Sequence, residues 1–372
     1  MKNSSVSSVS SASPAPSASP APSRGSCSSR TAPASAAARS APVPVQHTRP
    51  KRRISFLRGA LTASLLLFSL LFALFPDRYV PVCLDGIRLW ALNVLPAVFP
   101  FLFVVSLLQI TGGAEKVSRA FTPLSHALFG TGGAGGFCFF MSILSGYPVG
   151  ATLVAGFYKD GRLSDREAKI LACACSTSGP LFIVGSVGAG MFSDKRTGFL
   201  ILAAHLIAVL LSGVLLRLLS CRRGKRQMRG VSVPHSSQKL SLSDGIRNSA
   251  ITAIGVGGCI AFFYVLAAMA SDFHLLQPLQ RAISHIPALA PYADGLSRGL
   301  IEMTSGCLSA ASISSPLSAP CCAFLVTLGG ASILFQQVAC LRSANVRISF
   351  FLAVKLFQSV VAFFLCLLFV SF

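Results

Sequence analysis

Long apolar stretches alternate with short polar segments along most of this chain. From residue 54 onward, seven stretches each reach about the 20 residues that a helix needs to cross a bilayer. The pattern therefore predicts an all-α polytopic membrane protein with about seven transmembrane helices. The predicted spans cover residues 54–75, 93–110, 168–192, 197–219, 248–270, 319–340 and 348–370.

Glycine, proline and small hydroxyl residues interrupt four of the apolar stretches. Backbone without helical hydrogen bonds is tolerated at membrane depth only where protein covers it or where it lines a cavity. Interrupted helices of this kind point to the binding site of a transporter. In chain order, the first to fourth breaks are Ser145-Gly146-Tyr147-Pro148-Val149-Gly150, Ser176-Thr177-Ser178-Gly179-Pro180, Glu302-Met303-Thr304-Ser305-Gly306 and Thr327-Leu328-Gly329-Gly330.

The first and third breaks lie in segments that we expect to be re-entrant hairpins. Basic residues gather just before residue 54 and in residues 221–247, as they do in cytoplasmic segments of membrane proteins. Both basic segments lie on the cytoplasmic side only if residues 133–158 enter and leave the membrane on the same side. Residues 293–312 are too short and too polar for a span and form the second expected hairpin. The N-terminus is thus predicted to be cytoplasmic.

Composition and pattern divide the chain into five segments. The Ser-, Ala- and Pro-rich tail has no acidic residue and is predicted to be disordered, although such a composition also resembles a transit peptide. Ser164 and Glu167 are spaced as a capping box, which predicts the start of a helix. The segments are the tail 1–50, a first helix with an interfacial stretch at 84–92 (51–92), a first repeat 93–219, a basic loop 220–247 and a second repeat 248–372.

The two repeats are predicted from matching short motifs. Phe101-Leu-Phe-Val-Val corresponds to Ala261-Phe-Phe-Tyr-Val, and Ser145-Gly146 corresponds to Ser305-Gly306, both at a separation of 160 residues. Ser178-Gly179 corresponds to Leu328-Gly329 at a separation of 150. Each half reads as span, hairpin, span, span, and the halves enter from opposite sides. This is the inverted-repeat arrangement of secondary transporters, although Gly-rich apolar segments also align by chance.

Composition supports a membrane protein and argues against other classes. The 372 residues are 53% hydrophobic and 12% charged, whereas soluble domains carry about 25% charged residues. The net charge of +21 comes from the tail and short loops, and no basic groove with aromatic side chains is visible, so nucleic acid is not an expected partner. Most of the twelve cysteines lie in apolar stretches, where they act as small hydrophobes. No metal-ligand spacing, P-loop, Ser-His-Asp order or HExxH motif appears, so neither an enzyme nor a bound metal or cofactor is expected.

Glu302 is the main candidate for function because it lies in a segment placed at membrane depth. A carboxyl group there is costly and by default faces a cavity or a partner. It could take a proton or a cation, with Arg298 one turn earlier as a pairing partner. The alternatives are a purely structural ion pair and an interfacial position.

Hydroxyl groups and helix ends beside the breaks are further candidates. Exposed helix ends offer amides and carbonyls to a polar solute, while small hydroxyls also serve plain helix packing in membranes. Gln336 and Gln337 follow the fourth break and either reach the same centre or lie at the interface, and the mid-span His205 is expected to be a packed histidine. The predicted binding residues are Ser145, Gly146, Tyr147, Pro148, Ser176, Thr177, Ser178, Gly179, Pro180, Glu302, Thr304, Ser305, Gly306 and Gln336.

Three of these motifs resemble the YlbJ family of sporulation integral membrane proteins from endospore-forming bacteria. The resemblance covers roughly residues 55–372 and implies a nucleoside-recognition, or Gate, domain, which concentrative nucleoside transporters and ferrous-iron transport proteins share. It implies a role in spore formation and the transport of a solute. The tail and the weakly polar fourth break depart from the family pattern. The motifs are Ser145–Ala151, Cys175–Gly185 with Val187–Phe192, and Gly299–Gly306.

Two functions are consistent with this reading. The first is a permease of the cell membrane that moves a small polar, nucleoside-like solute by alternating access, with Glu302 and the hydroxyls of the breaks at its centre. The second is a non-transporting scaffold that recruits spore-envelope assembly proteins through residues 221–247. Expected partners are the lipid bilayer, a small polar solute or coupling ion, and either further copies of the chain or spore-envelope proteins.

Overall fold

The computed structural model describes residues 52–221 and 241–372. The chain divides into two compact units between Arg58 and Gly59, a boundary that falls inside α1 (Arg52–Leu74). The structure describes only the start of α1 in the first unit. The predicted tail 1–50 and most of the predicted basic loop 220–247 lie outside the described residues. The second unit, Gly59–Phe372, contains every other described element.

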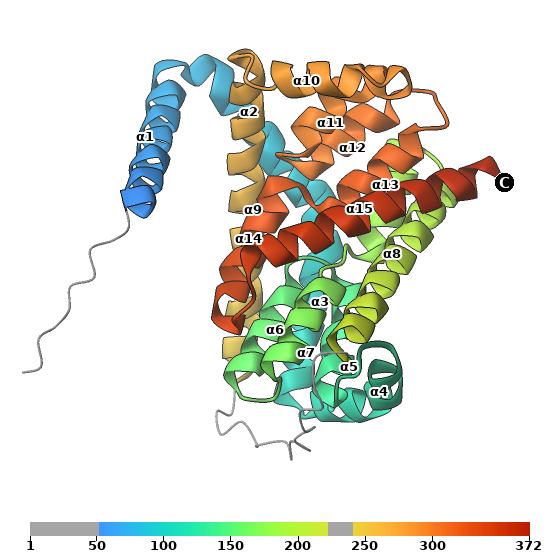
Figure 1. Ribbon diagram of the computed structural model, residues 1–372. Helices are drawn as coiled ribbons and strands as arrows, with labels where there is room; N and C mark the ends of the chain where they lie inside the picture. The colour runs from blue at the N-terminus through green and yellow to red at the C-terminus, as the bar shows by residue number, and fades with distance from the viewer. Residues whose placement is uncertain (1–51, 222–240) are drawn as a thin grey trace, which may run out of the picture. The chain divides into compact units, whose positions relative to one another are not determined.

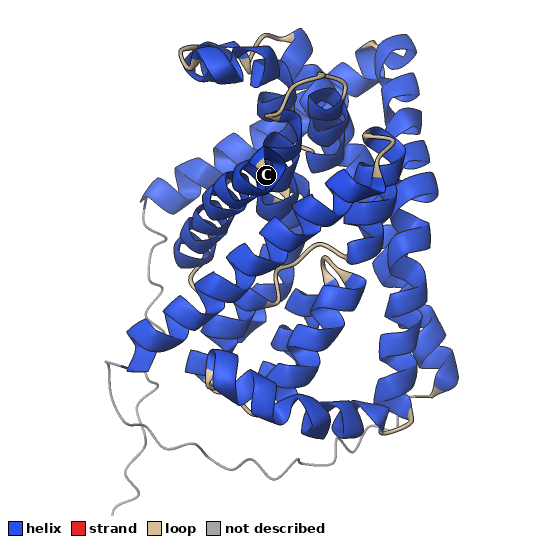
Figure 2. Cartoon of the chain, turned by 90° about the vertical axis from the view of Figure 1, so that its right-hand side faces the viewer, coloured by secondary structure: helices blue, strands red, loops and turns tan. Residues whose placement is uncertain are grey.

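All described elements of residues 52–221 and 241–372 are helices, which confirms the predicted all-α class (Figure 2). Five helical runs are long and apolar enough to cross a membrane, or six if one sharply bent pair counts as a span. Of the two other predicted spans, residues 54–75 form most of the 23-residue α1, whose described side chains begin at Arg58, and residues 168–192 are broken in the middle. The count of seven stays a prediction. The five runs are Pro76–Ile110, Lys195–Ser220, Leu242–Asp272, Ser318–Ala344 and Ile348–Ser371.

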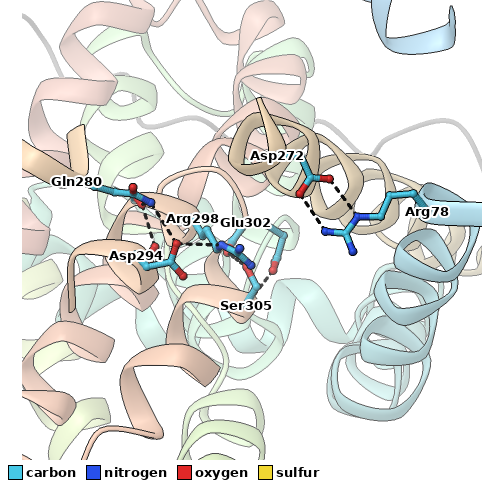
Figure 3. Close-up of polar contacts among 8 residues, drawn as sticks. Arg78, Asp272, Gln280, Asp294, Arg298, Glu302 and Ser305 are labelled. Carbon is cyan, nitrogen blue, oxygen red and sulfur yellow. Dashed lines mark hydrogen bonds and ion pairs between the residues drawn. The ribbon is translucent and has the colours of Figure 1, made fainter. Parts of the chain in front are cut away.

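The interfacial stretch predicted at residues 84–92 and the segment boundary predicted at Asn93 both fall within a single helical run. α2 (Pro76–Leu89), a π-helical turn (Trp90–Val94) and α3 (Leu95–Ile110) form one continuous helical run. The wide turn lies just before Pro96, which has no N–H to donate to the helix. This run packs along α9 (Leu242–Asp272), and Arg78 and Asp272 form an ion pair of 2.9 Å between the two (Figures 1 and 3).

The first half of the unit contains both kinds of expected break. α4 (Gly113–Phe129) meets α5 (Gly133–Ser145) at 91°, and α5 turns back into α6 (Val149–Lys159), so the segment expected as the first hairpin is a pair of helices. α7 (Asp165–Ala174) starts at the predicted capping box of Ser164 and Glu167, which the structure confirms. After the second break come a π-helix (Leu181–Met191) and the long α8 (Lys195–Cys221).

The second half contains the other two breaks, and the inverted repeat stays a prediction. α11 (Ala293–Gly299) and α12 (Met303–Ala311) form the second expected helix pair, α13 (Ser318–Leu328) and α14 (Gly330–Leu341) flank the fourth break, and α15 (Ile348–Ser371) is the long final helix. One motif pair is not equivalent, because Gly146 lies in a turn whereas Gly306 lies inside α12. The remaining short elements are α10 (Gln277–Ser284) and the 3-10 helices Pro287–Tyr292 and Arg342–Ala344.

The run Ser318–Ala344 lies at the centre of the unit. Of its most apolar stretch, 72% is buried inside the protein, against 22% to 39% in the other four long runs. α13 packs against α8, α12 and α15, and α14 packs against α6 and α9. Figure 2 shows that non-helical segments lie among the helices in the interior of the unit as well as at its ends.

Candidate functional site

The first and second breaks contact each other through their backbones. Gly146 ends α5 with φ +74° and ψ −162°, a conformation that essentially only glycine adopts. A Cβ atom at Gly146 would lie 2.4 Å from the backbone nitrogen of Gly179. At Gly150, on the next turn, it would lie 2.0 Å from the carbonyl oxygen of Cys175. Glycine is thus required where the turn between α5 and α6 meets the second break.

Hydrogen bonds hold the second break in its non-helical conformation. Thr177 Oγ1 donates to the carbonyl oxygen of Ser142 at 2.7 Å, and the Ser178 N–H donates to His205 Nε2 at 3.1 Å. Because Nε2 accepts, a neutral His205 carries its proton on Nδ1, which lies 2.9 Å from Thr327 Oγ1. Thr177 and Ser178 are both buried. The second break is therefore tied to α5 and α8, and through His205 to the last turn of α13.

Glu302 is buried, with 2% of its surface exposed, and caps the N-terminus of α12. Its Oε1 accepts from the N–H of Thr304 at 3.0 Å, and its Oε2 accepts from the N–H of Ser305 at 2.7 Å (Figure 3). Amides at the start of a helix favour a negative charge. Each carboxylate oxygen keeps a second lone pair for a further donor.

The predicted pairing of Arg298 with Glu302 is wrong. Arg298 Nε lies 3.3 Å from Asp294 Oδ1, one turn earlier on α11, and Figure 3 shows the two side chains meeting. Among the described residues, Glu302 takes part in no ion pair. The alternative of a structural Arg–Glu pair is therefore excluded for Arg298, and the carboxyl group of Glu302 remains available to another partner.

The third and fourth breaks are joined by backbone hydrogen bonds. The N–H groups of Ala331 and Ser332, in the first turn of α14, donate to the carbonyl oxygens of Leu300 and Ile301 at 2.7 and 3.0 Å. Gly330 has φ +63°, and a Cβ atom there would lie 2.8 Å from the carbonyl oxygen of Gly299. The turn before Glu302 thus caps α14 and fixes the direction in which α14 leaves the fourth break.

A cavity lies where these segments converge. It holds about 550 Å³ of empty space, part of which is open solvent. Its walls come from the first three breaks together with the run 76–110, α9 and α14. The polar and glycine wall residues are Ser145, Gly146, Tyr147, Ser178, Gly179, Glu302, Thr304 and Gln336, and the apolar ones are Val94, Ala97, Val98, Phe182, Val256, Ile260, Met303 and Ile333.

Eight of the predicted binding residues therefore line one cavity, and six do not. Ser176 and Thr177 bond within the protein, and Ser305 donates its hydroxyl to the carbonyl oxygen of Glu302 at 2.9 Å. Gly306 packs against α11, where an added Cβ would lie 2.3 Å from the Cα of Gly299. The six residues that do not line the cavity are Pro148, Ser176, Thr177, Pro180, Ser305 and Gly306.

Ser145 and Tyr147 each place a hydroxyl group in the cavity lining, and the two hydroxyls differ in their hydrogen bonds. The Oγ of Ser145 is buried and has no hydrogen-bond partner among the described residues. The Tyr147 hydroxyl instead donates to the carbonyl oxygens of Val326 and Thr327, at 3.2 Å each. Buried polar groups in proteins are nearly always paired, so an unpaired hydroxyl on a cavity wall is a candidate contact for a ligand.

Sequence reasoning missed Lys355, which is fully buried in α15. Its Nζ donates to the Tyr147 hydroxyl at 3.1 Å and to the carbonyl oxygen of Ser176 at 3.0 Å. A signal for it was present, since the argument that selects Glu302 applies to any charged residue inside an apolar span. Gln337 is also buried and accepts from Ser176 Oγ, so it bonds within the protein and does not line the cavity.

Comparisons with known proteins agree with the predicted resemblance. Residues 91–195 match the family model described as Gate, nucleoside recognition. Over 301 residues the chain is 27% identical to the sporulation integral membrane protein YlbJ of Bacillus subtilis (strain 168), and the match covers 74% of each chain. No solved structure matches the chain significantly. The Gate match contains the first and second breaks, whereas Glu302 lies outside it.

Proposed function

We propose that this chain is a membrane permease that works in sporulation and moves a small polar solute through the cavity between its broken helices. The similarity to a sporulation integral membrane protein and the Gate match support the cellular role. The helical runs long enough to cross a membrane support an integral position, which the similarity to YlbJ also favours.

The observation that carries the proposal is the convergence of the breaks on one cavity with a buried carboxylate on its wall. Breaking a helix inside a membrane exposes amides and carbonyls, which costs free energy unless they are bonded or serve a ligand. Here much of the broken backbone is bonded within the protein, while Glu302 and the Ser145 hydroxyl face the cavity. Transporters place their substrates at this kind of junction, near the middle of the membrane.

The cavity wall favours a solute with hydrogen-bond donors on one side and an apolar or aromatic body on the other. Glu302 accepts hydrogen bonds, while Tyr147 and Phe182 are aromatic residues of the same cavity lining. No aromatic clamp for a base is evident from the sequence, and Tyr147 and Phe182 are the aromatic residues that the structure places in the cavity lining. These groups support the finer proposal of a nucleoside-like solute, whose hydroxyls would donate to Glu302.

The test compares Glu302→Gln with Glu115→Gln, a change of the same type on α4 and away from the cavity. Purified variants in liposomes are assayed for uptake of radiolabelled uridine and adenosine, and the same variants are scored for heat-resistant spores in a native host without its own copy. Glu302→Gln should abolish both readouts at normal protein levels, and Glu115→Gln should preserve both.

The opposite pattern would support the scaffold. If Glu302→Gln retains spore formation and deletion of residues 222–240 abolishes it, the result supports recruitment of proteins through the basic loop and contradicts a transport function. If Glu302→Gln forms no heat-resistant spores but liposomes with the parent chain take up neither nucleoside, the permease proposal is kept and the nucleoside-like solute is rejected.

A further inference from the structure

Lys355 is a charged side chain in the first half of a helix long and apolar enough to cross a membrane, and it is fully buried. Burying an ammonium group away from water is expensive unless other groups compensate. Among the residues that the structure describes, no aspartate or glutamate forms an ion pair with it. The compensation must therefore come from dipoles.

Two helix ends supply those dipoles. The Ser176 carbonyl, which accepts from Lys355 at 3.0 Å, follows the C-terminus of α7. The Tyr147 hydroxyl accepts from Lys355 at 3.1 Å and donates to the carbonyls of Val326 and Thr327 in the last turn of α13. The final carbonyls of a helix lack partners within it and carry partial negative charge. The ammonium thus lies where two helix C-termini meet, bonded to the unwound backbone that follows α7 and reaching the end of α13 through Tyr147.

The other groups around Lys355 add no negative charge. Its Nζ lies 5.2 Å from the centre of the Tyr147 ring, a distance at which the ring attracts a cation. The remaining titratable neighbours are His205 on α8 and Cys173 on α7, both within electrostatic range of the amine. His205 accepts a backbone N–H through Nε2, as a neutral imidazole does. The cluster therefore favours one positive charge, held by carbonyl groups and an aromatic ring.

We propose that Lys355 is a tethered cation that occupies the place where a free coupling cation such as Na⁺ would bind. Carbonyls of unwound backbone and the C-terminal ends of half-helices are the groups that coordinate Na⁺ in secondary transporters. Here the ammonium takes that role, so the first and second breaks are held together without a bound metal ion. The inference rests on the proposed function, because a coupling cation has meaning only in a transporter.

The test measures the melting temperature of the purified full chain in detergent. Sodium chloride replaces choline chloride stepwise at constant ionic strength, and a parallel series uses methylammonium chloride. The variants are the parent, Lys355→Ala and Gln358→Ala. Gln358 is a matched control: it lies one turn along α15, is buried, and donates to the Cys173 carbonyl at 3.1 Å and to Ser212 Oγ at 2.6 Å.

The parent should melt at the same temperature in both salts. Lys355→Ala should melt lower, and Na⁺ or methylammonium should raise its melting temperature saturably by a few °C, because a ligand that binds only the folded state stabilises it. Gln358→Ala should also melt lower but should not respond to either cation, because its removal leaves no place for a positive charge.

Three results would overturn the proposal. The first is a saturable stabilisation of the parent by Na⁺ over choline, which does not require any variant to fold. The second is a Lys355→Ala chain that melts like the parent. The third is a destabilised Lys355→Ala chain whose melting temperature responds to neither cation. If Lys355→Ala does not fold, Lys355→Gln is measured in its place. Melting needs no transport, so rescue of Lys355→Ala in a chain without uptake would reject the permease and leave Lys355 in a cation site that has no coupling role.

Discussion

Gly146 and Gly179 lie backbone against backbone, and this contact joins the first break to the second. A methyl group added at Gly146 would lie 2.4 Å from the backbone nitrogen of Gly179, closer than real Cβ atoms approach any neighbour. The dihedral angles of Gly146 add a second restriction, since its φ is +74°. The contact thus depends on the absence of a side chain at Gly146.

We therefore expect Gly146→Ala to destabilise the protein strongly. The substitution forces alanine into a backbone region that costs about 1–3 kcal/mol, and the clash with Gly179 adds to this. The melting temperature in detergent measures the loss. Gly156→Ala in α6 is the control, because nothing lies within 4 Å of a Cβ there, and alanine favours a helix by about 0.5–1 kcal/mol. Equal melting temperatures for the two variants would contradict the contact.

Ser145→Ala should separate stability from function. Because the Ser145 hydroxyl is buried without a partner among the described residues, its removal should leave stability unchanged or raise it by about 1 kcal/mol. If the hydroxyl contacts the solute, the KM for uptake should rise. Ser142→Ala on the same helix removes a bond of 2.8 Å to the Phe139 carbonyl and should lower stability by about 1 kcal/mol. A marked loss of stability in Ser145→Ala would show that its hydroxyl is bonded.

The positions of the breaks could be predicted because they depend on local chemistry. Clusters of glycine, proline and small hydroxyl residues weaken a helix locally, and Gly146, Gly179 and Gly329 lie at interruptions, whereas the single Gly156 and Gly306 lie inside helices. The start of α7 was equally local, since Ser164 and Glu167 satisfy each other's backbone. Signals of this kind need no knowledge of tertiary contacts.

The partners of the buried groups could not be predicted in the same way. Arg298 lies one turn from both Glu302 and Asp294, and spacing alone does not choose between them. The structure chooses Asp294 because Glu302 turns toward the amides of α12. His205 is a packed, hydrogen-bonded histidine, as expected, but its position between the second break and Thr327 depends on how α8 crosses α13. Long-range packing, rather than local pattern, fixes such contacts.

Asp194 should contribute stability that is lost in acid. Its carboxylate accepts from the Thr197 hydroxyl at 2.7 Å and from the backbone N–H groups of Thr197 and Arg196, and these bonds lower its pKa. A lowered pKa stabilises the folded state above the ordinary value of about 3.9, and the benefit disappears as pH falls through the folded-state pKa. Asp194→Asn should therefore lower the melting temperature at pH 7 and reduce its dependence on pH below about 4. A parent and variant with parallel acid profiles would rule this contribution out.

Three consecutive residues of α14 should differ sharply in their access to water. Phe335 is 59% exposed on the outer face of the helix, Gln336 lines the cavity and Gln337 is fully buried. In a cysteine-depleted parent, Gln336→Cys should react with a membrane-impermeant cationic thiosulfonate, whereas Phe335→Cys, facing lipid, and Gln337→Cys should not. Labelling is measured by the mass increase of the purified chain.

The charge of Glu302 should control that reaction. With Glu302→Gln added, the cationic reagent should label Gln336→Cys more slowly and its anionic counterpart faster, because a carboxylate on the cavity wall attracts cations and repels anions. Glu115→Gln on α4 should change neither rate. If Glu302→Gln slows labelling by both reagents equally, the substitution closes the cavity. If both labelling rates stay unchanged, the charge of Glu302 does not influence the labelling reaction.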